Sequence, residues 1–220
     1  MQATRVIAIR HGETAWNVAT RIQGQLDVPL NANGLWQAQR MAASLVGEGI
    51  DCIYASDLLR AYETAQTLSA VSQCSVQTDE GLREREFGIF QGKTFAEIDS
   101  LWPEQARRWR QRDPEFAPEG GESLIVFRDR VLNTVQRLLR QHPDQQVALV
   151  SHGGVMDVLY RAATGQALDA PRTWELGNAA INRLLWAAPA ADAAHSSGLS
   201  LVGWSDTRHL EEGQRDEATA

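Results

Sequence analysis

The protein has 220 residues, of which 43% are hydrophobic and 22% charged, a composition typical of a folded globular protein that excludes a disordered chain or a coiled coil. Its 28 acidic and 21 basic residues give a net charge of -7, so we expect no nucleic-acid partner and no attraction to anionic membranes. Two cysteines, no apolar run near the roughly 20 residues of a membrane span and no signal-peptide core at the start predict a cytoplasmic protein.

Apolar runs and amphipathic stretches alternate from the start of the chain. The run 6–9 is typical of a buried strand. The stretch 34–46 has apolar residues at helical spacing and follows Asn33, a residue type that caps helices. The face that this helix is expected to bury consists of Leu35, Ala38, Ala42 and Leu45.

A second strand and helix follow directly. The run 52–55 has the character of a buried strand, and a helical pattern then continues through Leu68. Ser56 or Asp57 is expected to cap this helix, because both side chains can accept a hydrogen bond from its free N–H groups.

The second half of the chain repeats the alternation. A helix is predicted over 122–139, a strand over 147–150, a helix over 155–163, and two further strands over 182–186 and 199–204. The inward face predicted for the helix over 122–139 consists of Leu124, Phe127, Val131 and Leu138.

Strands that alternate with helices indicate an α/β fold. We predict a three-layer α/β/α sandwich with a mostly parallel central sheet, in one domain over 1–220. The Ala-, Ser- and Pro-rich stretch 187–198 is expected to be a surface loop, and the tail over 211–220 to be disordered.

Polar side chains follow three of the expected strands. Arg10 and His11 follow the first strand, Arg60 comes shortly after the second, and His152 follows the third. The carboxyl ends of parallel strands meet at one edge of a sheet, where ligands bind, so these side chains should converge. A glycine after each histidine lets the backbone approach closely and leaves main-chain N–H groups for an anion. Arginine forks suit phosphate, so the pattern predicts a phosphate site.

The motifs around these residues resemble those of the histidine phosphatase superfamily, which includes cofactor-dependent phosphoglycerate mutases and many small phosphatases. The matching segments are Arg10-His11-Gly12-Glu13 with Trp16-Asn17, Arg21-Ile22-Gln23-Gly24 with Asp27, Ser56-Asp57-Leu58 with Arg60-Ala61, Leu82-Arg83-Glu84 with Phe87-Gly88, Gly120-Gly121-Glu122-Ser123 with Arg130, and Ser151-His152-Gly153-Gly154. One position departs from the pattern: Gln91 stands where the family often has a glutamate.

The resemblance implies a phosphohistidine mechanism. His11 would attack phosphorus, Arg10 and Arg60 would hold the phosphoryl oxygens, and His152 would stabilise their charge. His11 has to be neutral to act as a nucleophile, and two neighbouring guanidinium groups disfavour its charged form.

The resemblance also implies an acid and a set of substrate contacts. Glu84 would protonate the leaving oxygen and later deprotonate water, and Glu86, in the same run of charged residues, competes for this role. The substrate contacts that the resemblance implies are Thr14, Asn17, Gln23, Gly24 and Gly153. It implies no metal and no cofactor, and the partner is a small phosphorylated substrate.

Two other classes of site use the same residues. His11, His152, Asp57 and Glu84 could in principle bind a metal, but two arginines in the same site would repel a cation. A protein without catalytic activity could instead recognise a phosphorylated partner. The presence of all five expected catalytic residues argues against this: Arg10, His11, Arg60, Glu84 and His152.

Within the family, the choice lies between a phosphatase and a mutase. Mutases carry a longer insertion between the acid and the Gly-Gly-Glu-Ser segment, and the short stretch between Glu84 and Gly120 favours a phosphatase. A cap is expected over about 92–120, with Trp102, Trp109 and Phe116 as candidate lining. The arginines of that span, interpreted as an exposed basic helix, are Arg107, Arg108, Arg110 and Arg112. Sugar phosphates, phosphoglycerates and nucleotide-like phosphates all fit as substrates, and the segment 204–210 is expected to fold back near the site.

Overall fold

The computed structural model of the protein describes residues 3–189 and 197–211. In these ranges six strands form one sheet in the order β3-β2-β4-β1-β5-β6. The strands are β1 (Thr4–Arg10), β2 (Cys52–Ala55), β3 (Val76–Thr78), β4 (Gln146–Ser151), β5 (Ile181–Trp186) and β6 (Leu199–Asp206). The first four are parallel to one another, whereas β5 is antiparallel to both of its neighbours, β1 and β6.

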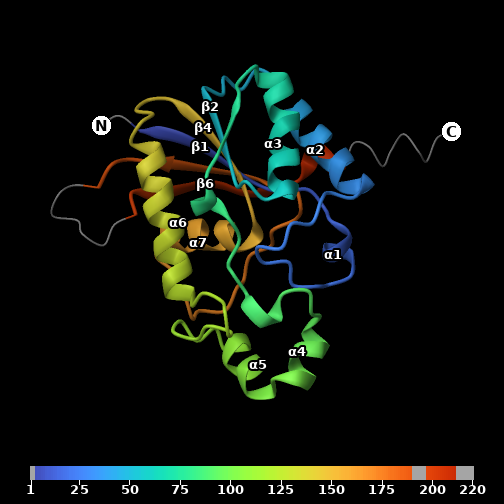
Figure 1. The fold of residues 1–220 in the computed structure, drawn as a ribbon. Coiled ribbons are helices and arrows are strands. Elements are labelled where there is room, and N and C mark those ends of the chain that lie inside the picture. The colour runs from blue at the N-terminus through green and yellow to red at the C-terminus, as the bar shows by residue number, and fades with distance from the viewer. Residues whose placement is uncertain (1–2, 190–196, 212–220) are drawn as a thin grey trace.

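Helices cover both faces of the sheet (Figure 1). The described helices are α1 (Ala15–Val18), α2 (Ala32–Ser44), α3 (Leu59–Ser72), α4 (Phe95–Leu101), α5 (Pro103–Arg110), α6 (Leu124–Leu139) and α7 (Gly153–Thr164). Single 3-10 turns are η1 (Glu80–Leu82), η2 (Gly88–Phe90) and η3 (Arg208–Leu210). The pair α2 and α3 lies on one face and the pair α6 and α7 on the other, while α4 and α5 form a cap beyond one end of the sheet (Figure 1).

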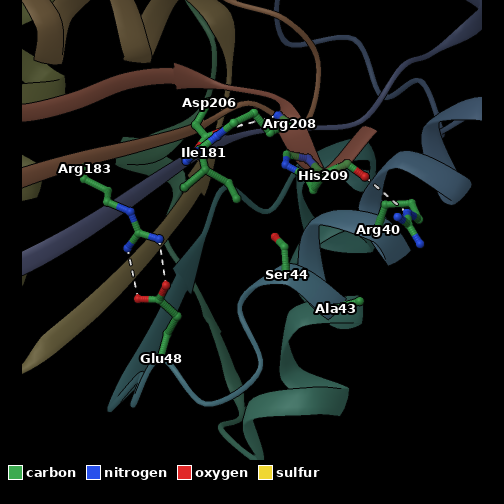
Figure 2. A pocket seen from close by; sticks show the side chains of 9 residues that line it. All are labelled: Arg40, Ala43, Ser44, Glu48, Ile181, Arg183, Asp206, Arg208 and His209. Atoms are coloured by element: carbon green, nitrogen blue, oxygen red, sulfur yellow. Dashed lines mark hydrogen bonds and ion pairs between the residues drawn. The ribbon is translucent and has the colours of Figure 1, made fainter. Parts of the chain in front are cut away.

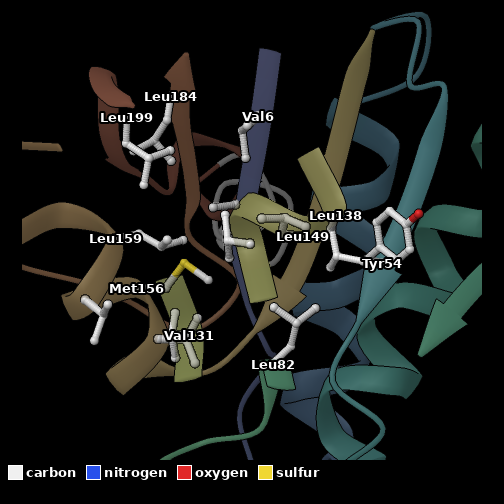
Figure 3. Packing of buried hydrophobic residues seen from close by; sticks show 14 of the residues in the cluster. Val6, Tyr54, Leu82, Val131, Leu138, Leu149, Met156, Leu159, Leu184 and Leu199 are labelled. Carbon is white, nitrogen blue, oxygen red and sulfur yellow. The ribbon is translucent and has the colours of Figure 1, made fainter. Parts of the chain in front are cut away.

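Two apolar clusters hold the three layers together. In β1, Val6 and Ala8 belong to the cluster under α6 and α7, and Ile7 and Ile9 to the cluster under α2 and α3, because side chains alternate along a strand. Figure 3 shows the first cluster, in which side chains of the sheet meet those of α6 and α7. Each fully buried aliphatic side chain contributes about 1.5–3 kcal/mol, so both helical layers are firmly attached to the sheet.

The predicted α/β sandwich is confirmed, and so are all five predicted strands, whose ends move by a few residues. The short strand β3 was not predicted, because its three residues are largely exposed at the sheet edge and show no buried apolar run. The reversed direction of β5 was not predicted either, since an apolar run does not encode strand direction.

The predicted start of α2 is wrong by two residues. The cap is Asn31, whose side chain accepts the N–H of Gly34 at 2.7 Å, and not Asn33. Backbone in an extended conformation at Asn31 lets the helix begin at Ala32. Of the expected inward face, Ala38, Ala42 and Leu45 are buried, but Leu35 is 44% exposed, because the buried face also runs through Met41.

The predicted cap of α3 is also wrong. The helix begins at Leu59, and neither Ser56 nor Asp57 caps it. The Asp57 carboxylate instead pairs with Arg83, and the N–H of Leu59 donates to Asp27, distant in sequence, at 2.6 Å. The carboxylate of Asp27, and not a residue next to the helix, thus accepts a hydrogen bond from a free N–H group at the start of α3.

The helix predicted over 122–139 begins two residues later, with Ser123 as its cap. Glu122 stays outside the helix because its carboxylate pairs with Arg130 at 2.7 Å. Three of its four expected inward residues, Phe127, Val131 and Leu138, are buried.

The cap over the end of the sheet, formed by α4 and α5, has an apolar core of its own. Phe90, Ile98, Ala106 and Phe116 are buried there, and Trp102 packs against them. Trp102 and Phe116 therefore stabilise the cap and line no described pocket of the site, contrary to expectation. Of the three aromatic candidates only Trp109 lines a cavity that adjoins the site.

The expected loop and tail are described only in part. Residues 187–189 and 197–198 contain no helix or strand, as predicted, while 190–196 lie outside the described residues. The predicted tail, apart from Glu211, also lies outside them. Within the described ranges, none of the helices has the length and apolarity to cross a membrane.

Candidate active site

The side chains that follow β1, β2 and β4 converge on one cavity. This cavity, which we call the histidine pocket, has a volume of about 160 Å³. Its lining residues are Arg10, His11, Asn17, Arg21, Ile22, Gln23, Gly24, Arg60, Glu84, Phe87 and Gly153. Eight of the ten residues predicted from the sequence are among them, because the parallel register of β1, β2 and β4 aligns the carboxyl ends of these strands.

His11 presents an unprotonated nitrogen to this pocket. Its Nδ1 lies 2.7 Å from the carbonyl oxygen of Gly12, and because a carbonyl only accepts hydrogen bonds, Nδ1 carries the proton. The free lone pair is therefore on Nε2. Burial, followed by the positive charges of Arg60 and Arg10, holds the pKa of His11 well below its ordinary value of 6.5. The ring is neutral at physiological pH and ready to act as a nucleophile.

His152 lies beside His11 but does not itself line the pocket. The two ring centroids are 5.2 Å apart, and His152 is completely buried. Burial and then the charge of Arg60 hold the pKa of His152 well below 6.5. Neither of its ring nitrogens has a hydrogen-bond partner among the described residues.

Two arginines whose Nε atoms are buried line the same pocket. Arg60 is 0% exposed and donates to the carbonyl oxygens of Gly24 and Leu26, and Arg10 donates to that of Leu176. The Nε of each arginine is buried without a partner in the described part of the chain. Burial lowers the pKa of Arg60 to about 10, so the group remains charged at neutral pH. Unpaired buried donors are rare in proteins, and here they indicate an anion site.

Glu84 also lines the pocket and is held there by main-chain groups. Its Oε2 accepts the N–H of Gly154 at 2.9 Å, at the start of α7, and its Oε1 accepts the N–H of Arg85 at 2.8 Å. A Cβ on Gly154 would lie 2.1 Å from Oε1, so only glycine permits this approach. Each oxygen keeps a second lone pair, which leaves room for a proton toward the pocket.

The competitor Glu86 does not line the histidine pocket. The arginines on either side of Glu84 also turn away from its carboxylate. Arg83 pairs with Asp57, and Arg85 donates to the carbonyl oxygens of Glu122 and Phe116. Of the two candidate acids, the structure therefore brings Glu84 to His11.

Arg130 secures the backbone that carries Glu84. Its guanidinium donates to the carbonyl oxygens of Gly81, Arg83 and Glu84 and makes a two-pronged ion pair with Glu122. One guanidinium thereby satisfies three carbonyls of an irregular segment. The position of Glu84 thus depends on a residue of α6.

Two of the expected substrate contacts, Thr14 and Asn17, lie near the start of α1, and only Asn17 lines the histidine pocket. Thr14 is fully buried and caps α1, so it does not line the histidine pocket. The Oδ1 of Asn17 accepts the N–H and the hydroxyl of Thr14, which leaves the Nδ2 amide, a donor, for the pocket. Thr14 thus orients Asn17.

The predicted role of the glycine N–H groups is only partly met. The N–H of Gly12 donates to Thr64 and that of Gly154 to Glu84, so neither is free for an anion. Gly153 does line the pocket. Gly12 remains necessary because a Cβ there would lie 2.4 Å from the carbonyl oxygen of Gly34.

The carboxyl-terminal segment lies beside α2 and lines a different cavity (Figure 2). The Nε of Arg40, on α2, donates to the carbonyl oxygen of His209 at 3.2 Å, and Asp206 pairs with Arg208. None of the predicted site residues lines this cavity. Trp204 of the same segment donates to the carbonyl oxygen of Glu175, next to Leu176, whose carbonyl oxygen accepts a hydrogen bond from Arg10.

The sequence motifs already contained three lining residues that we did not single out: Arg21, Ile22 and Phe87. The first two stand in the segment that carries Gln23, and the third follows the acid. The described residues contain no group of three or more His, Cys, Asp and Glu side chains placed to hold a metal ion.

The protonation of His11 can be measured directly. Because its pKa in the folded protein is lowered from 6.5, its Hε1 resonance should stay constant as the pH falls from about 8 to about 6. Removing a positive charge with Arg60→Met should raise the pKa toward 6.5. Below pH 6.5, His11 is protonated in the unfolded chain but stays unprotonated in the folded protein. The free energy of unfolding should therefore fall as the pH falls below 6.5.

NMR titration with His11→Gln for assignment checks this prediction. Arg83→Met is the matched control, because that guanidinium pairs with Asp57 outside the pocket. A wild-type His11 that titrates at 6.5 or above, or an equal shift in both arginine variants, would contradict it.

Comparison with known proteins places this geometry in context. Residues 6–195 match the family model of the histidine phosphatase superfamily (branch 1). The chain is 37% identical over 212 residues to phosphoglycerate mutase-like protein 4 of Arabidopsis thaliana, covering 94% of this chain and 87% of the relative. It is 34% identical over 215 residues to a metal-independent phosphoserine phosphatase of the same plant, covering 95% and 84%. A mycobacterial glucosyl-3-phosphoglycerate phosphatase solved with VO3 is similar at a TM-score of 0.78 and 34% identity, covering 91% and 98%.

Proposed function

The chain belongs to the histidine phosphatase superfamily (branch 1), and on this premise we propose that it is a metal-independent phosphomonoester hydrolase acting on a small phosphorylated metabolite. The observation that carries the proposal is that His11 lines one pocket with Arg10 and Arg60, whose buried Nε atoms have no hydrogen-bond partner among the described residues, and that the equally unpartnered ring of His152 lies beside His11. Hydrogen-bond donors from two charged forks suit the oxygens of a phosphoryl group. Relatives whose names specify phosphoserine and glucosyl-3-phosphoglycerate support a small substrate.

In the first step, Nε2 of His11 attacks phosphorus in line with the leaving oxygen. A P–N bond forms, the bond from phosphorus to the ester oxygen breaks, and a protonated Glu84 gives its proton to that oxygen. Arg10, Arg60 and His152 stabilise the charge on the three phosphoryl oxygens.

In the second step, water attacks the phosphohistidine. Glu84, now a carboxylate, takes a proton from the water, the P–N bond breaks, and His11 returns to its neutral form as inorganic phosphate is released. The same carboxyl group acts first as acid and then as base, and the main-chain N–H groups of Arg85 and Gly154 hold it in one position for both steps.

The arginines of the pocket also bear on metal independence. Arg10, Arg21 and Arg60 line the same small cavity, and their positive charges oppose a divalent cation there. A relative named as a metal-independent phosphatase supports the same proposal.

Hydrolysis and phosphoryl transfer to a second position can be separated in one experiment. Chelator-treated protein is given 3-phosphoglycerate with and without 2,3-bisphosphoglycerate, and inorganic phosphate and 2-phosphoglycerate are both measured. We expect release of phosphate that does not depend on the bisphosphate or on added metal. Formation of 2-phosphoglycerate that requires the bisphosphate would instead assign a mutase, and activity restored only by metal would overturn metal independence.

A further inference from the structure

A second cavity adjoins the histidine pocket on the far side of Glu84. This cavity, which we call the outer chamber, has a volume of about 150 Å³ and shares Glu84, Phe87 and Gly153 with the histidine pocket. Its other lining residues are Arg85, Trp109, Arg112, Leu124, Phe127, Gly154, Asp157, Val158, Leu168 and Arg172. Both cavities are smaller than the roughly 300–1,000 Å³ of drug-sized ligand pockets, so together they suit a small metabolite.

The outer chamber lies where the leaving group has to be. Glu84 lines both cavities, and the proposed function has it protonate the ester oxygen. With the phosphoryl group beside His11, the rest of the substrate extends past Glu84 into the outer chamber. The residues of this chamber are therefore the ones that select the leaving group.

The chamber has more positive than negative charge. Arg112 and Arg161 both donate to the Oδ2 of Asp157, at 2.8 and 2.9 Å, and Arg172 lies 3.9 Å from its Oδ1. The Asp157 carboxylate thus faces three guanidinium groups, and Glu84 is the other acidic residue of the lining. Arg161 is used up structurally, since it also donates to the carbonyl oxygens of Ala167 and Ala170.

Arg172 and Arg112 keep donors available for a ligand. No hydrogen bond from the Arg172 guanidinium to any described residue is present, and 3.9 Å to Asp157 is too long for one. Arg112 uses Nη2 on Asp157 and Nε on the carbonyl oxygen of Leu168, which leaves its Nη1 without a partner among the described residues. Buried Oδ1 of Asp157 also lacks a hydrogen-bond partner there.

The apolar residues of the chamber do not favour an aromatic leaving group. Trp109 is stacked on Phe95 with ring centroids 5.2 Å apart and also packs edge-on against Phe87. Phe95 occupies one face of this ring, so Trp109 offers an aromatic leaving group only part of its ring surface.

We infer that the outer chamber binds a carboxylate of the leaving group, with Arg172 as its main contact and Arg112 as its second. The substrates are then phosphomonoesters of small hydroxy acids. A planar carboxylate matches the fork of a guanidinium, and its negative charge offsets part of the positive excess around Asp157. This inference rests on the proposed function, because it takes the phosphoryl group to lie beside His11.

The test uses two substrates that differ only in the group in question. 3-Phosphoglycerate has a carboxylate where glycerol 3-phosphate has a hydroxymethyl group. We expect the wild-type kcat/KM to be at least about ten-fold higher for 3-phosphoglycerate, and Arg172→Gln to lower this ratio by about ten- to a hundred-fold. Arg172→Lys should restore part of the ratio. Arg208→Gln, a matched change at an 84% exposed side chain in a different cavity, should leave the ratio unchanged.

Two outcomes overturn the inference: equal kcat/KM for the two substrates in the wild type, or a ratio that Arg172→Gln does not change. Thermal unfolding of each variant shows whether the fold is intact. Calorimetric binding of both compounds to His11→Ala protein measures the same preference without chemistry. The wild type could hydrolyse no phosphomonoester while the His11→Ala protein still binds 3-phosphoglycerate more tightly than glycerol 3-phosphate. In that case the proposed function fails and the carboxylate site stands.

Discussion

Replacing His11 with alanine is expected to lower kcat for phosphomonoester hydrolysis by at least about 10⁴-fold. The neutral Nε2 of His11 is the only proposed nucleophile, and the loss of its P–N bond removes the two-step route entirely. The charges of Arg10 and Arg60 can still bind phosphate, so affinity for inorganic phosphate should largely persist. The measurement is phosphate release from p-nitrophenyl phosphate and 3-phosphoglycerate after chelator treatment.

A trapping experiment makes the test specific for the bond. Wild-type protein quenched during turnover of a ³²P-labelled substrate should carry an acid-labile, base-stable label on the peptide that contains His11. His142→Ala is the matched control, because His142 lies outside the pocket and interacts with Tyr54 and Gln145. A label on another residue, or full activity of His11→Ala, would falsify the phosphohistidine mechanism.

Replacing Glu84 with glutamine is expected to lower kcat for 3-phosphoglycerate by about 10²–10⁴-fold. The amide keeps the size of the side chain and can still meet a main-chain donor, but it neither gives nor takes the proton. The effect should depend on the leaving group, because p-nitrophenolate leaves without a proton whereas an alkoxide does not. With p-nitrophenyl phosphate we expect a burst of nitrophenol followed by slow turnover, since attack by water also lacks its base.

Glu86→Gln is the matched control for this variant. Glu86 carries the same charge two positions further along but lines neither the histidine pocket nor the outer chamber. We expect its activity to stay close to that of the wild type. A large loss in Glu86→Gln with little change in Glu84→Gln would reverse the assignment of the acid.

The Gln91 position shows how a departure from a family pattern is accommodated. Its Oε1 accepts the N–H of Gln25 at 2.6 Å, next to Gly24 of the histidine pocket. An amide oxygen accepts this bond as a carboxylate would, so the loop around Gly24 keeps its anchor.

The sequence by itself predicted five of the six described strands and eight of the eleven residues that line the histidine pocket. Apolar runs at 6–9, 52–55 and 147–150 are short and buried, and each polar motif begins where its run ends. Strand ends meet at one edge of a parallel sheet, so local patterns were sufficient to bring His11, Arg60 and His152 together.

Only the tertiary structure decided what depends on contacts between distant segments. The caps of α2 and α3, the direction of β5 and the separation of Thr14 from the pocket follow from competition for hydrogen bonds that no local pattern records. The outer chamber is the clearest case. Arg112 follows α5 with a φ of +54°, which turns it from the exposed helix expected there toward Asp157 of α7. Arg172 arrives from a segment without helix or strand, so its position depends entirely on packing.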